Sequence, residues 1–354
     1  MSTAPPPSSS SSSSVFVTGL LILLLVLRSS NCSAASTTVS RPRQLSTDYY
    51  AKSCPHLEQL VGSVTSQQFK EAPVSAPATI RLFFHDCFVE GCDGSILIAS
   101  GAGNGGGKAE RDAEENKDLA AEGFDTIQKA KAVAESNCPG VVSCADILAI
   151  AARDFVHLHS LQAGGPYYEV KKGRWDGNIS MASRVSSNLP HPNSTMADLL
   201  NLFSSKGLSI DDLIVLSGAH SIGFAHCAHF LSRLYNFRGT KSPDPAVDPR
   251  LLKALRMSCP ESGGNPDVLV PFDVTTPFSF DNAYYSNLED NLGLLATDQA
   301  LFLDQRSRAL VQAFAKDKHQ FFQAFSVAMD KMGSIGVKSG RLHGEMRRDC
   351  SMHT

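Results

Sequence analysis

Two histidines of this chain lie in opposite chemical settings. Arg81 precedes His85 by four residues, whereas no cation precedes His220 within a helical turn. Residues four apart share a helix face, so Arg81 and His85 should point into one space. The fixed charge of the guanidinium should lower the pKa of the imidazole, which makes His85 a neutral general base beside an electrophilic cation. Such a pair suits a small anionic or polar oxidant.

His220 is the better candidate for a metal ligand. A ligating histidine normally donates its second ring N–H to a carboxylate, and Asp298 is the best partner that the sequence offers. His226, Cys227 and His229 raise a zinc alternative, but their offsets from His220 do not place all four on one helix face. A zinc or serine hydrolase also lacks support, because the sequence has neither His-Glu-x-x-His nor Gly-x-Ser-x-Gly.

Two oxygen-rich sets are candidates for calcium, which accepts mixed carboxylate, hydroxyl and carbonyl ligands. The first set follows His85 and comprises the side chains of Asp86, Asp93 and Ser95 with the carbonyls of Val89 and Gly91. The second comprises Asp273, Thr276, Ser279 and Asp281, with Ser221 next to His220. Taken alone, either set is better explained by turn-forming Asx and Ser/Thr residues.

Composition indicates a globular protein. The chain has 354 residues, of which 42% are hydrophobic, and this is ample for a buried core. A net charge of -3 without long blocks of one sign gives no electrostatic footprint for nucleic acid or an anionic membrane.

Residues 1–35 are expected to be a cleaved secretory signal peptide. An apolar run from Val15 to Leu27 is too short to span a bilayer, and small residues follow near 31–35. An uncleaved anchor or another targeting peptide is the alternative, since no Lys or Arg precedes the run and Arg28 follows it.

Secretion would also explain the cysteines and two sequons. Cleavage removes Cys32 and leaves eight cysteines, enough for four disulfides whose pairing these considerations leave open. Asn178 and Asn193 begin glycosylation sequons, which suit a secreted protein but also arise by chance.

Helical spacing dominates after the signal peptide. Apolar spacing predicts helices over 57–64 and 124–134, and Ser143 should cap a buried helix that runs to about Asp154. Capping boxes at 195–198 and 209–212 predict two more helices, the second running into His220. Further starts are expected at Asp248-Pro249, Asp281-Asn282, Asp304 and Lys318, the last helix reaching about Met332.

Extended structure should be scarce. The only convincing strand pair involves Tyr167 to Lys172 and its surroundings, between Gly164-Gly-Pro166 and Gly173. Gly101 to Gly107 is interpreted as a surface loop, because no strand precedes it and no Gly-Lys-Ser/Thr follows. The fold is therefore predicted to be mainly α.

Four motifs in order carry a resemblance to a known family. Residues 80–95 (IRLFFHDCFVEGCDGS) and 213–227 (LIVLSGAHSIGFAHC) closely resemble the distal and proximal haem signatures of the class III secretory plant peroxidases, in the plant-type haem peroxidase superfamily. Residues 142–149 and 280–285 match two further family stretches, and the match runs from about Asp48 to Cys350. The resemblance implies a two-lobed, all-helical peroxidase domain over 36–354, with one haem b between distal and proximal lobes and a very small β component.

The resemblance also implies roles for single residues. His85 would be the proton acceptor, Arg81 the transition-state stabiliser and Phe84 a shield for the ferryl oxygen. Asn116 would fix the His85 tautomer, and the acid Glu110 would extend that hydrogen-bond line. His220 would be the axial ligand of the haem iron with Asp298 as its partner, and Pro190 would mark the aromatic-donor site.

Structural roles follow from the same resemblance. The expected disulfides are Cys54–Cys138, Cys87–Cys92, Cys144–Cys350 and Cys227–Cys259. The two oxygen-rich sets correspond to two calcium sites, and Asp146 and Arg174 to a buried ion pair. Two departures stand out: Ser221 replaces the commoner Thr but keeps the hydroxyl, and Glu114-Glu115 precede Asn116. These two carboxylates are expected near the distal loop, where they would shift the pKa of His85 or the pH optimum.

The implied activity is that of a secreted haem peroxidase. It would reduce H2O2 to water through a ferryl intermediate and oxidise phenolic donors, such as lignin and suberin monomers, wall phenolics and auxin, by one-electron steps. Roles in cell-wall modification, oxidative stress and defence would follow. We expect a monomer. We expect an extracellular location, because the chain ends four residues after Cys350 without the extension of vacuolar members. The alternative is a calcium-loaded binding protein that keeps the fold without turnover, but Arg81, His85, Asn116, His220 and Asp298 are all present.

Overall fold

The predicted helices form around the capping and apolar residues that indicated them. The computed structural model describes residues 45–101, 107–157 and 164–353, so the expected signal peptide and most of the Gly101–Gly107 loop lie outside the described residues. The first helices are α1 (Leu57–Glu71), α2 (Ser75–Val89), α3 (Ala121–Asn137) and α4 (Cys144–His157). Ser143 Oγ accepts a hydrogen bond from the Asp146 amide across 3.1 Å, as expected of a cap.

Both capping boxes begin the helices that they predict. Thr195 precedes α5 (Met196–Ser205) and Ser209 precedes α6 (Ile210–Ser217), and each hydroxyl accepts from the backbone N–H three residues on. The second helix does not run unbroken into His220. It ends at Ser217 and tightens into the 3-10 helix η5 (Gly218–Ser221), where a Cβ on Gly218 would lie 2.5 Å from the Tyr285 hydroxyl.

The remaining helices are α7 (Cys227–Tyr235), α8 (Pro249–Ser258), α9 (Ala283–Glu289), α10 (Ala296–Leu303), α11 (Arg308–Lys316) and α12 (Lys318–Met332). The starts predicted at Asp248, Asp281 and Lys318 agree with α8, α9 and α12. The start predicted at Asp304 is wrong, because Asp304 follows the end of α10 and α11 begins only at Arg308.

The strand prediction is wrong. Tyr167 to Lys172 forms no named strand, although more exposed and more buried residues alternate there; Lys172 makes only an isolated bridge to Ser46. The two-stranded antiparallel sheet of the described residues instead pairs β1 (Phe224–His226) with β2 (Leu269–Pro271), Ala225 opposite Val270. The mainly α fold class is confirmed.

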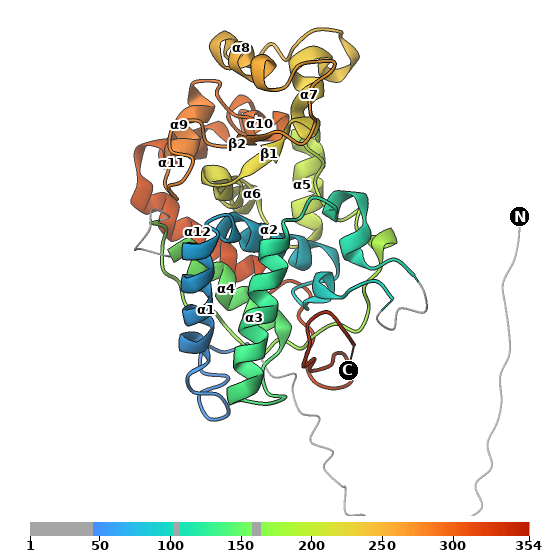
Figure 1. Cartoon of the computed structure of the whole chain (residues 1–354). Coiled ribbons are helices and arrows are strands. Elements are labelled where there is room, and N and C mark those ends of the chain that lie inside the picture. Colours follow the sequence, from blue (N-terminus) through green and yellow to red (C-terminus); the bar gives the residue numbers. More distant parts are fainter. Residues whose placement is uncertain (1–44, 102–106, 158–163, 354) are drawn as a thin grey trace, which may run out of the picture. The chain divides into compact units, whose positions relative to one another are not determined.

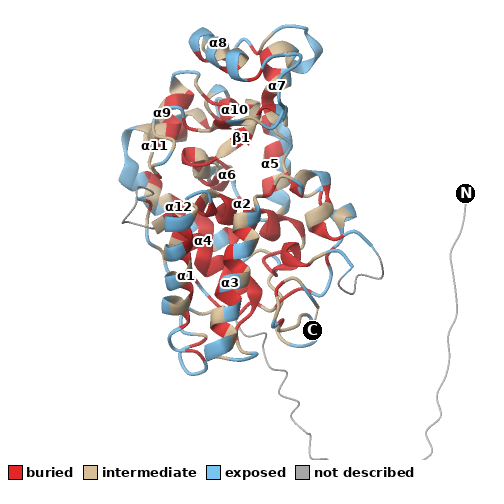
Figure 2. Cartoon of the chain, in the orientation of Figure 1, coloured by how far each residue is buried: buried red, intermediate tan, exposed pale blue. Residues whose placement is uncertain are grey.

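The described residues form two apolar cores. Helices α2 and α4 pack on each other and on α1 and α3 inside the larger core, and their buried residues form the red centre of Figure 2. A smaller core joins α7 and α8 to β1 and β2, in the half of Figure 1 that holds α9 and α10. The catalytic candidates on α2 and the ligand candidate on η5 both border the larger core and belong to one folded unit.

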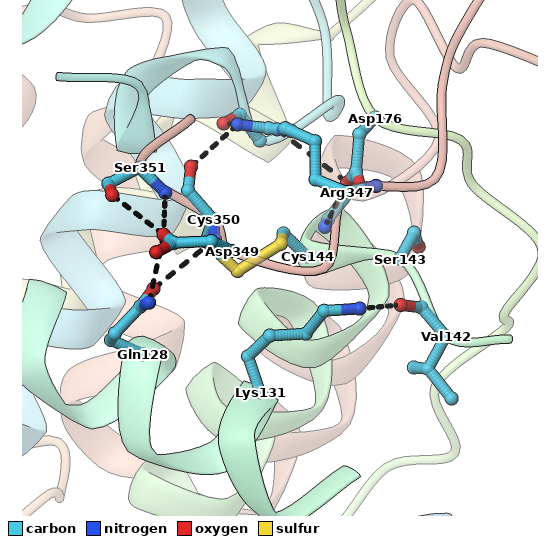
Figure 3. The surroundings of a disulfide bond; sticks show 12 residues. Gln128, Lys131, Val142, Ser143, Cys144, Asp176, Arg347, Asp349, Cys350 and Ser351 are labelled. Carbon is cyan, nitrogen blue, oxygen red and sulfur yellow. Dashed lines mark hydrogen bonds and ion pairs between the residues drawn. A yellow bond between two sulfur atoms is a disulfide. The ribbon is translucent and has the colours of Figure 1, made fainter. Parts of the chain in front are cut away.

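Four disulfides join the pairs that the family resemblance implies: Cys54–Cys138, Cys87–Cys92, Cys144–Cys350 and Cys227–Cys259. Figure 3 shows how Cys144–Cys350 fastens the C-terminal segment to α4. Beside it, the buried Arg347 donates to the carbonyl of Cys350 across 2.7 Å and to that of Gly94 across 2.8 Å. The end of the chain is thus tied to the loop that follows α2.

Candidate active site

Helix α2 presents Arg81 and His85 on one face, as their spacing predicts. Nε of Arg81 donates to Nε2 of His85 across 3.3 Å, and Nδ1 of His85 lies 2.6 Å from Oδ1 of Asn116. Because the Asn116 oxygen can only accept, the ring proton belongs on Nδ1 and the lone pair on Nε2. The structure therefore brings Arg81, His85 and Asn116 together and defines one tautomer of the histidine.

Asn116 is oriented by a contact that differs from the expected one. It ends the 3-10 helix η3 (Glu114–Asn116), and its Nδ2 donates to the backbone carbonyl of Glu110 across 2.8 Å. The Glu110 carboxyl does not extend the hydrogen-bond line; both of its oxygens are buried without a hydrogen-bond partner in the described part of the chain. The fold of the loop, which brings a carbonyl to Asn116, replaces the acid in this role.

The environment of His85 makes it a weak base. Its burial, and next the positive charge of Arg81, lower the pKa of His85 from 6.5 to about 3. The hydrogen bond that His85 donates to Asn116 acts in the opposite direction but its effect is smaller. The imidazole is therefore neutral at ordinary pH, with Nε2 able to accept a proton.

Sequence reasoning missed Asp118, the carboxylate that holds Arg81. Its Oδ1 accepts from NH2 of Arg81 across 2.8 Å, and its carbonyl accepts from NH1 across 3.2 Å. Its position two residues after Asn116 was the available sequence signal. The expected effect of Glu114 on the pKa of His85 is wrong, because its carboxylate pairs with Lys117 and its side chain is 82% exposed. Neither it nor Glu115 is among the charges that shift the pKa of His85, whereas Asp118 is.

His220 meets the carboxylate expected for it. Nδ1 of His220 lies 2.7 Å from Oδ1 of Asp298, which also accepts from the Tyr284 hydroxyl across 3.0 Å. Burial opposes ionisation of Asp298, but the His220 charge and these hydrogen bonds hold the pKa of Asp298 below its ordinary value. The imidazole stacks flat on the Phe272 ring, with centroids 4.0 Å apart.

These residues fit a haem. Nδ1 of His220 is engaged by Asp298, and no hydrogen bond to Nε2 occurs among residues 45–101, 107–157 and 164–353. A ring with a carboxylate on one nitrogen and a lone pair on the other is the usual arrangement of a metal-ligating histidine. His220 is thus the residue that would hold the iron, and the Phe272 ring would fix the plane of the imidazole.

The first oxygen-rich set begins at Asp86, the residue that follows His85 in the sequence. Asp86 and Asp93 are buried, and the Asp86 carboxylate accepts from the Gly94 amide across 2.9 Å. Burial, followed by the nearby Asp93 charge, raises the pKa of Asp86. The Ser95 hydroxyl is buried with no hydrogen-bond partner in the described residues. Two buried carboxylates beside a hydroxyl without a partner fit a calcium ion.

Val89 and Gly91 border the same turn. Val89 ends α2, and Gly91 follows at a φ of 104°, where a Cβ would lie 2.7 Å from the Gly336 backbone. Glycine is thus required both by the backbone conformation and by the close approach of a second chain segment.

The second oxygen-rich set lies next to His220. The Thr276 hydroxyl lies 3.3 Å from an Asp273 carboxylate oxygen and 3.1 Å from one of Asp281. Ser221 Oγ lies 3.1 Å from the Ser279 carbonyl and 2.9 Å from that of Asp281. All five residues therefore meet, and their oxygens fit a hard cation.

The other candidates are structural or lie nearer the surface. Asp146 and Arg174 form the expected buried ion pair at 2.8 Å. Pro190 is half-buried, and the sequon residues Asn178 and Asn193 are exposed.

The zinc alternative fails, because Cys227 is in a disulfide and the described residues hold no group of three or more His, Cys, Asp or Glu side chains suited to a metal. Within the same residues, no helix combines the length and apolarity that a membrane span needs.

Comparison with known proteins identifies the family. The peroxidase family model matches residues 61–317. The chain is 62% identical to Peroxidase 19 of Arabidopsis thaliana over 324 residues, which cover 90% of this chain and 92% of that protein. It is 51% identical to Peroxidase 55 of the same plant, with 87% and 90% covered. The chain belongs to the class III plant peroxidases, in the plant-type haem peroxidase superfamily, and is a peroxidase enzyme.

Proposed function

We propose that this peroxidase holds one haem b on His220 and uses Arg81, His85 and Asn116 to reduce H2O2 while it oxidises phenolic donors by one-electron steps. One observation carries the proposal. The ring of His85 is held at Nδ1 by Asn116, and its Nε2 lies 3.3 Å from the guanidinium of Arg81. A neutral base beside a fixed cation is suited to the cleavage of a small polar oxidant.

The bound haem would supply the redox centre between peroxide and donor. His85 would take a proton from one peroxide oxygen at Nε2 and return it to the other oxygen, which then leaves as water. Asn116 would keep the second ring proton on Nδ1, so that Nε2 always presents its lone pair. Arg81 would stabilise the negative charge that develops on the departing oxygen.

On the other side, His220 would bind the iron through Nε2. Asp298 would accept a hydrogen bond from Nδ1–H and give the ring imidazolate character, which raises its electron donation. Support comes from the 2.7 Å contact to a carboxylate that stays ionised despite its burial. Donors would approach near Pro190, as the family resemblance implies.

The cellular setting belongs to the same proposal. We infer a signal peptide at 1–35, a single peroxidase domain over 36–354 and a secreted, monomeric glycoprotein acting in the cell wall. The exposure of Asn178 and Asn193 is compatible with glycans at both sequons. Two calcium ions per chain would occupy the sets around Asp93 and Asp273. Wall phenolics are the donor class, and neither nucleic acid nor a membrane is a partner.

The test separates the two histidines. His85→Ala should keep the absorption band of bound haem but react with H2O2 about 10²- to 10⁴-fold more slowly in stopped-flow mixing. His220→Ala should weaken retention of the haem itself, measured by transfer to apomyoglobin. The exposed residue His319 provides the control, His319→Ala. If His85→Ala reacted with peroxide at the wild-type rate, the assignment of His85 would be wrong. Purified protein without bound haem would refute the whole proposal.

A further inference from the structure

Asp118 connects Arg81 to a histidine from another part of the fold. One of its carboxylate oxygens lies 2.8 Å from NH2 of Arg81, and the other lies 2.6 Å from Nε2 of His229. Arg81 belongs to α2 in the larger core, whereas His229 belongs to α7, which packs in the smaller core. Asp118 itself lies between η3 and α3. Three separate segments therefore meet at one carboxylate.

The contacts of Asp118 determine which way the guanidinium faces. Its carboxylate engages NH2 and its carbonyl engages NH1, so Nε remains to face His85. An arginine side chain has several freely rotating bonds, and orienting it during the reaction would cost conformational entropy. Contacts that hold it in one orientation beforehand remove that cost from the reaction. The same stretch of chain, 116–118, thus orients the base through Asn116 and the cation through Asp118.

His229 fixes the carboxylate in turn. Burial alone would raise the pKa of Asp118, but the hydrogen bond from His229 and the charge of Arg81 hold it well below its usual range. Asp118 therefore stays ionised and able to accept from both partners. The side chains of Arg81, Asp118 and His229 are 39%, 22% and 37% exposed, so packing alone does not immobilise them.

We propose that Asp118 is a positioning residue for Arg81 and that His229 acts through it by anchoring the carboxylate from α7. The inference rests on the proposed function, in which Arg81 assists peroxide cleavage. It adds a specific requirement: the reactivity towards H2O2 depends on Asp118 and His229, neither of which touches the reacting atoms.

The first experiment replaces the carboxylate. Asp118→Asn keeps the shape and removes the charge, and Asp304→Asn is the matched control because Asp304 pairs with Arg306 at 2.7 Å on the surface. The second-order rate constant for H2O2 should fall about 10- to 100-fold in Asp118→Asn, since small displacements of a catalytic group have effects of that size. The haem absorption band, the melting temperature and the KM for the donor should remain at wild-type values. An equal peroxide rate in Asp118→Asn and Asp304→Asn would overturn the proposal.

A second readout does not depend on activity. Phenylglyoxal modifies accessible arginines, and peptide mass spectrometry gives the rate at Arg81 alone. Asp118→Asn should be modified at Arg81 several-fold faster than the wild type, in both haem-loaded and haem-free protein. Unchanged protection of Arg81 would show that Asp118 does not hold the guanidinium. If the wild type neither bound haem nor consumed peroxide, the proposed function would fail while this measurement still tested the contact.

Variants of His229 separate anchoring from packing. His229→Gln retains an N–H donor for Asp118, whereas His229→Leu fills similar space without one. The peroxide rate constant should fall in His229→Leu by about 3- to 10-fold, the net worth of a typical hydrogen bond, and by less in His229→Gln. Equal losses in the two variants would contradict the anchoring role. These variants also keep the proposal testable if Asp118→Asn does not fold.

Discussion

Nδ1 of His220 lies 2.7 Å from Oδ1 of Asp298, a carboxylate that is only 2% exposed. His85 makes a contact of nearly equal length at its own Nδ1, but to the neutral amide oxygen of Asn116. The two rings are thus held alike and polarised differently. A carboxylate increases electron donation from Nε2, which suits a metal ligand, whereas an amide leaves a neutral acceptor of protons.

Replacement of Asp298 by Asn should weaken haem binding. The loss of the carboxylate lowers the basicity of His220, and partners of this kind contribute about 10- to 100-fold to metal affinity. Haem transfer to apomyoglobin measures the effect. Tyr284→Phe is the control, because it removes one hydrogen bond from Asp298 and keeps its charge. An Asp298→Asn protein that held haem as firmly as Tyr284→Phe would contradict the role of the carboxylate.

The peroxide reaction should depend on the charge of Arg81 through the pKa of His85. A base with a pKa of about 3 is active above that pH, so the rate constant should be level at neutral pH and fall only as the pH drops towards 3. Arg81→Gln removes the repelling cation and should move this acidic limb to higher pH, besides slowing the reaction. Burial remains the larger cause, so the shift should be partial.

Stopped-flow pH jumps measure the acidic limb of the wild type and that of Arg81→Gln before the protein unfolds in acid. Lys117→Gln removes a cation on an exposed side chain and serves as the control. An acidic limb at the same pH in Arg81→Gln and Lys117→Gln would show that Arg81 does not lower the pKa of His85.

Removal of calcium should destabilise the protein. EGTA should lower the melting temperature by roughly 5 °C or more, as expected for loss of a ligand held well above its dissociation constant. Added Ca²⁺ should restore it, and Mg²⁺ should not, because Mg²⁺ demands stricter geometry. Asp93→Asn should respond less to EGTA than Asp267→Asn, an exposed control. A melting temperature indifferent to EGTA would count against both calcium sites.

The disulfides should differ in their contribution to stability according to loop length. Cys144–Cys350 spans 206 residues, Cys227–Cys259 spans 32 and Cys87–Cys92 spans 5. The chain-entropy account predicts that paired Cys→Ser variants lose about 5, 4 and 2 kcal/mol of unfolding free energy, in that order. Guanidinium unfolding at saturating Ca²⁺ measures the series. The reverse order would mean that native-state contacts, such as those of Arg347, dominate over loop entropy.

Local interactions explain what was predictable from sequence. The Thr195 and Ser209 caps begin helices because each side chain bonds a backbone group three residues away. Arg81 and His85 share a face because helix geometry requires it. In the same way, Ser143 precedes the buried helix α4. These features depend on neighbours along the chain, so they are readable from residue types and spacing.

The wrong predictions concern contacts between distant segments. The bounding glycines and proline suggested a strand at 167–172, but a strand needs a partner, and the structure pairs Phe224–His226 with Leu269–Pro271 instead. The family resemblance implied a role for the Glu110 carboxyl, whereas the Glu110 backbone carbonyl makes the contact to Asn116. The Glu114 carboxylate forms an ion pair with Lys117 at the surface.

The sequence by itself determined the helical class, the pairing of a base with a cation on one helix, and a second histidine suited to a metal. Its motifs also indicated the peroxidase family, which the comparisons confirmed. Only the tertiary structure decided that Asp118 joins Arg81 to His229, which lies 111 residues after Asp118 in the chain. Loop paths and helix packing set that meeting, and no local rule encodes them.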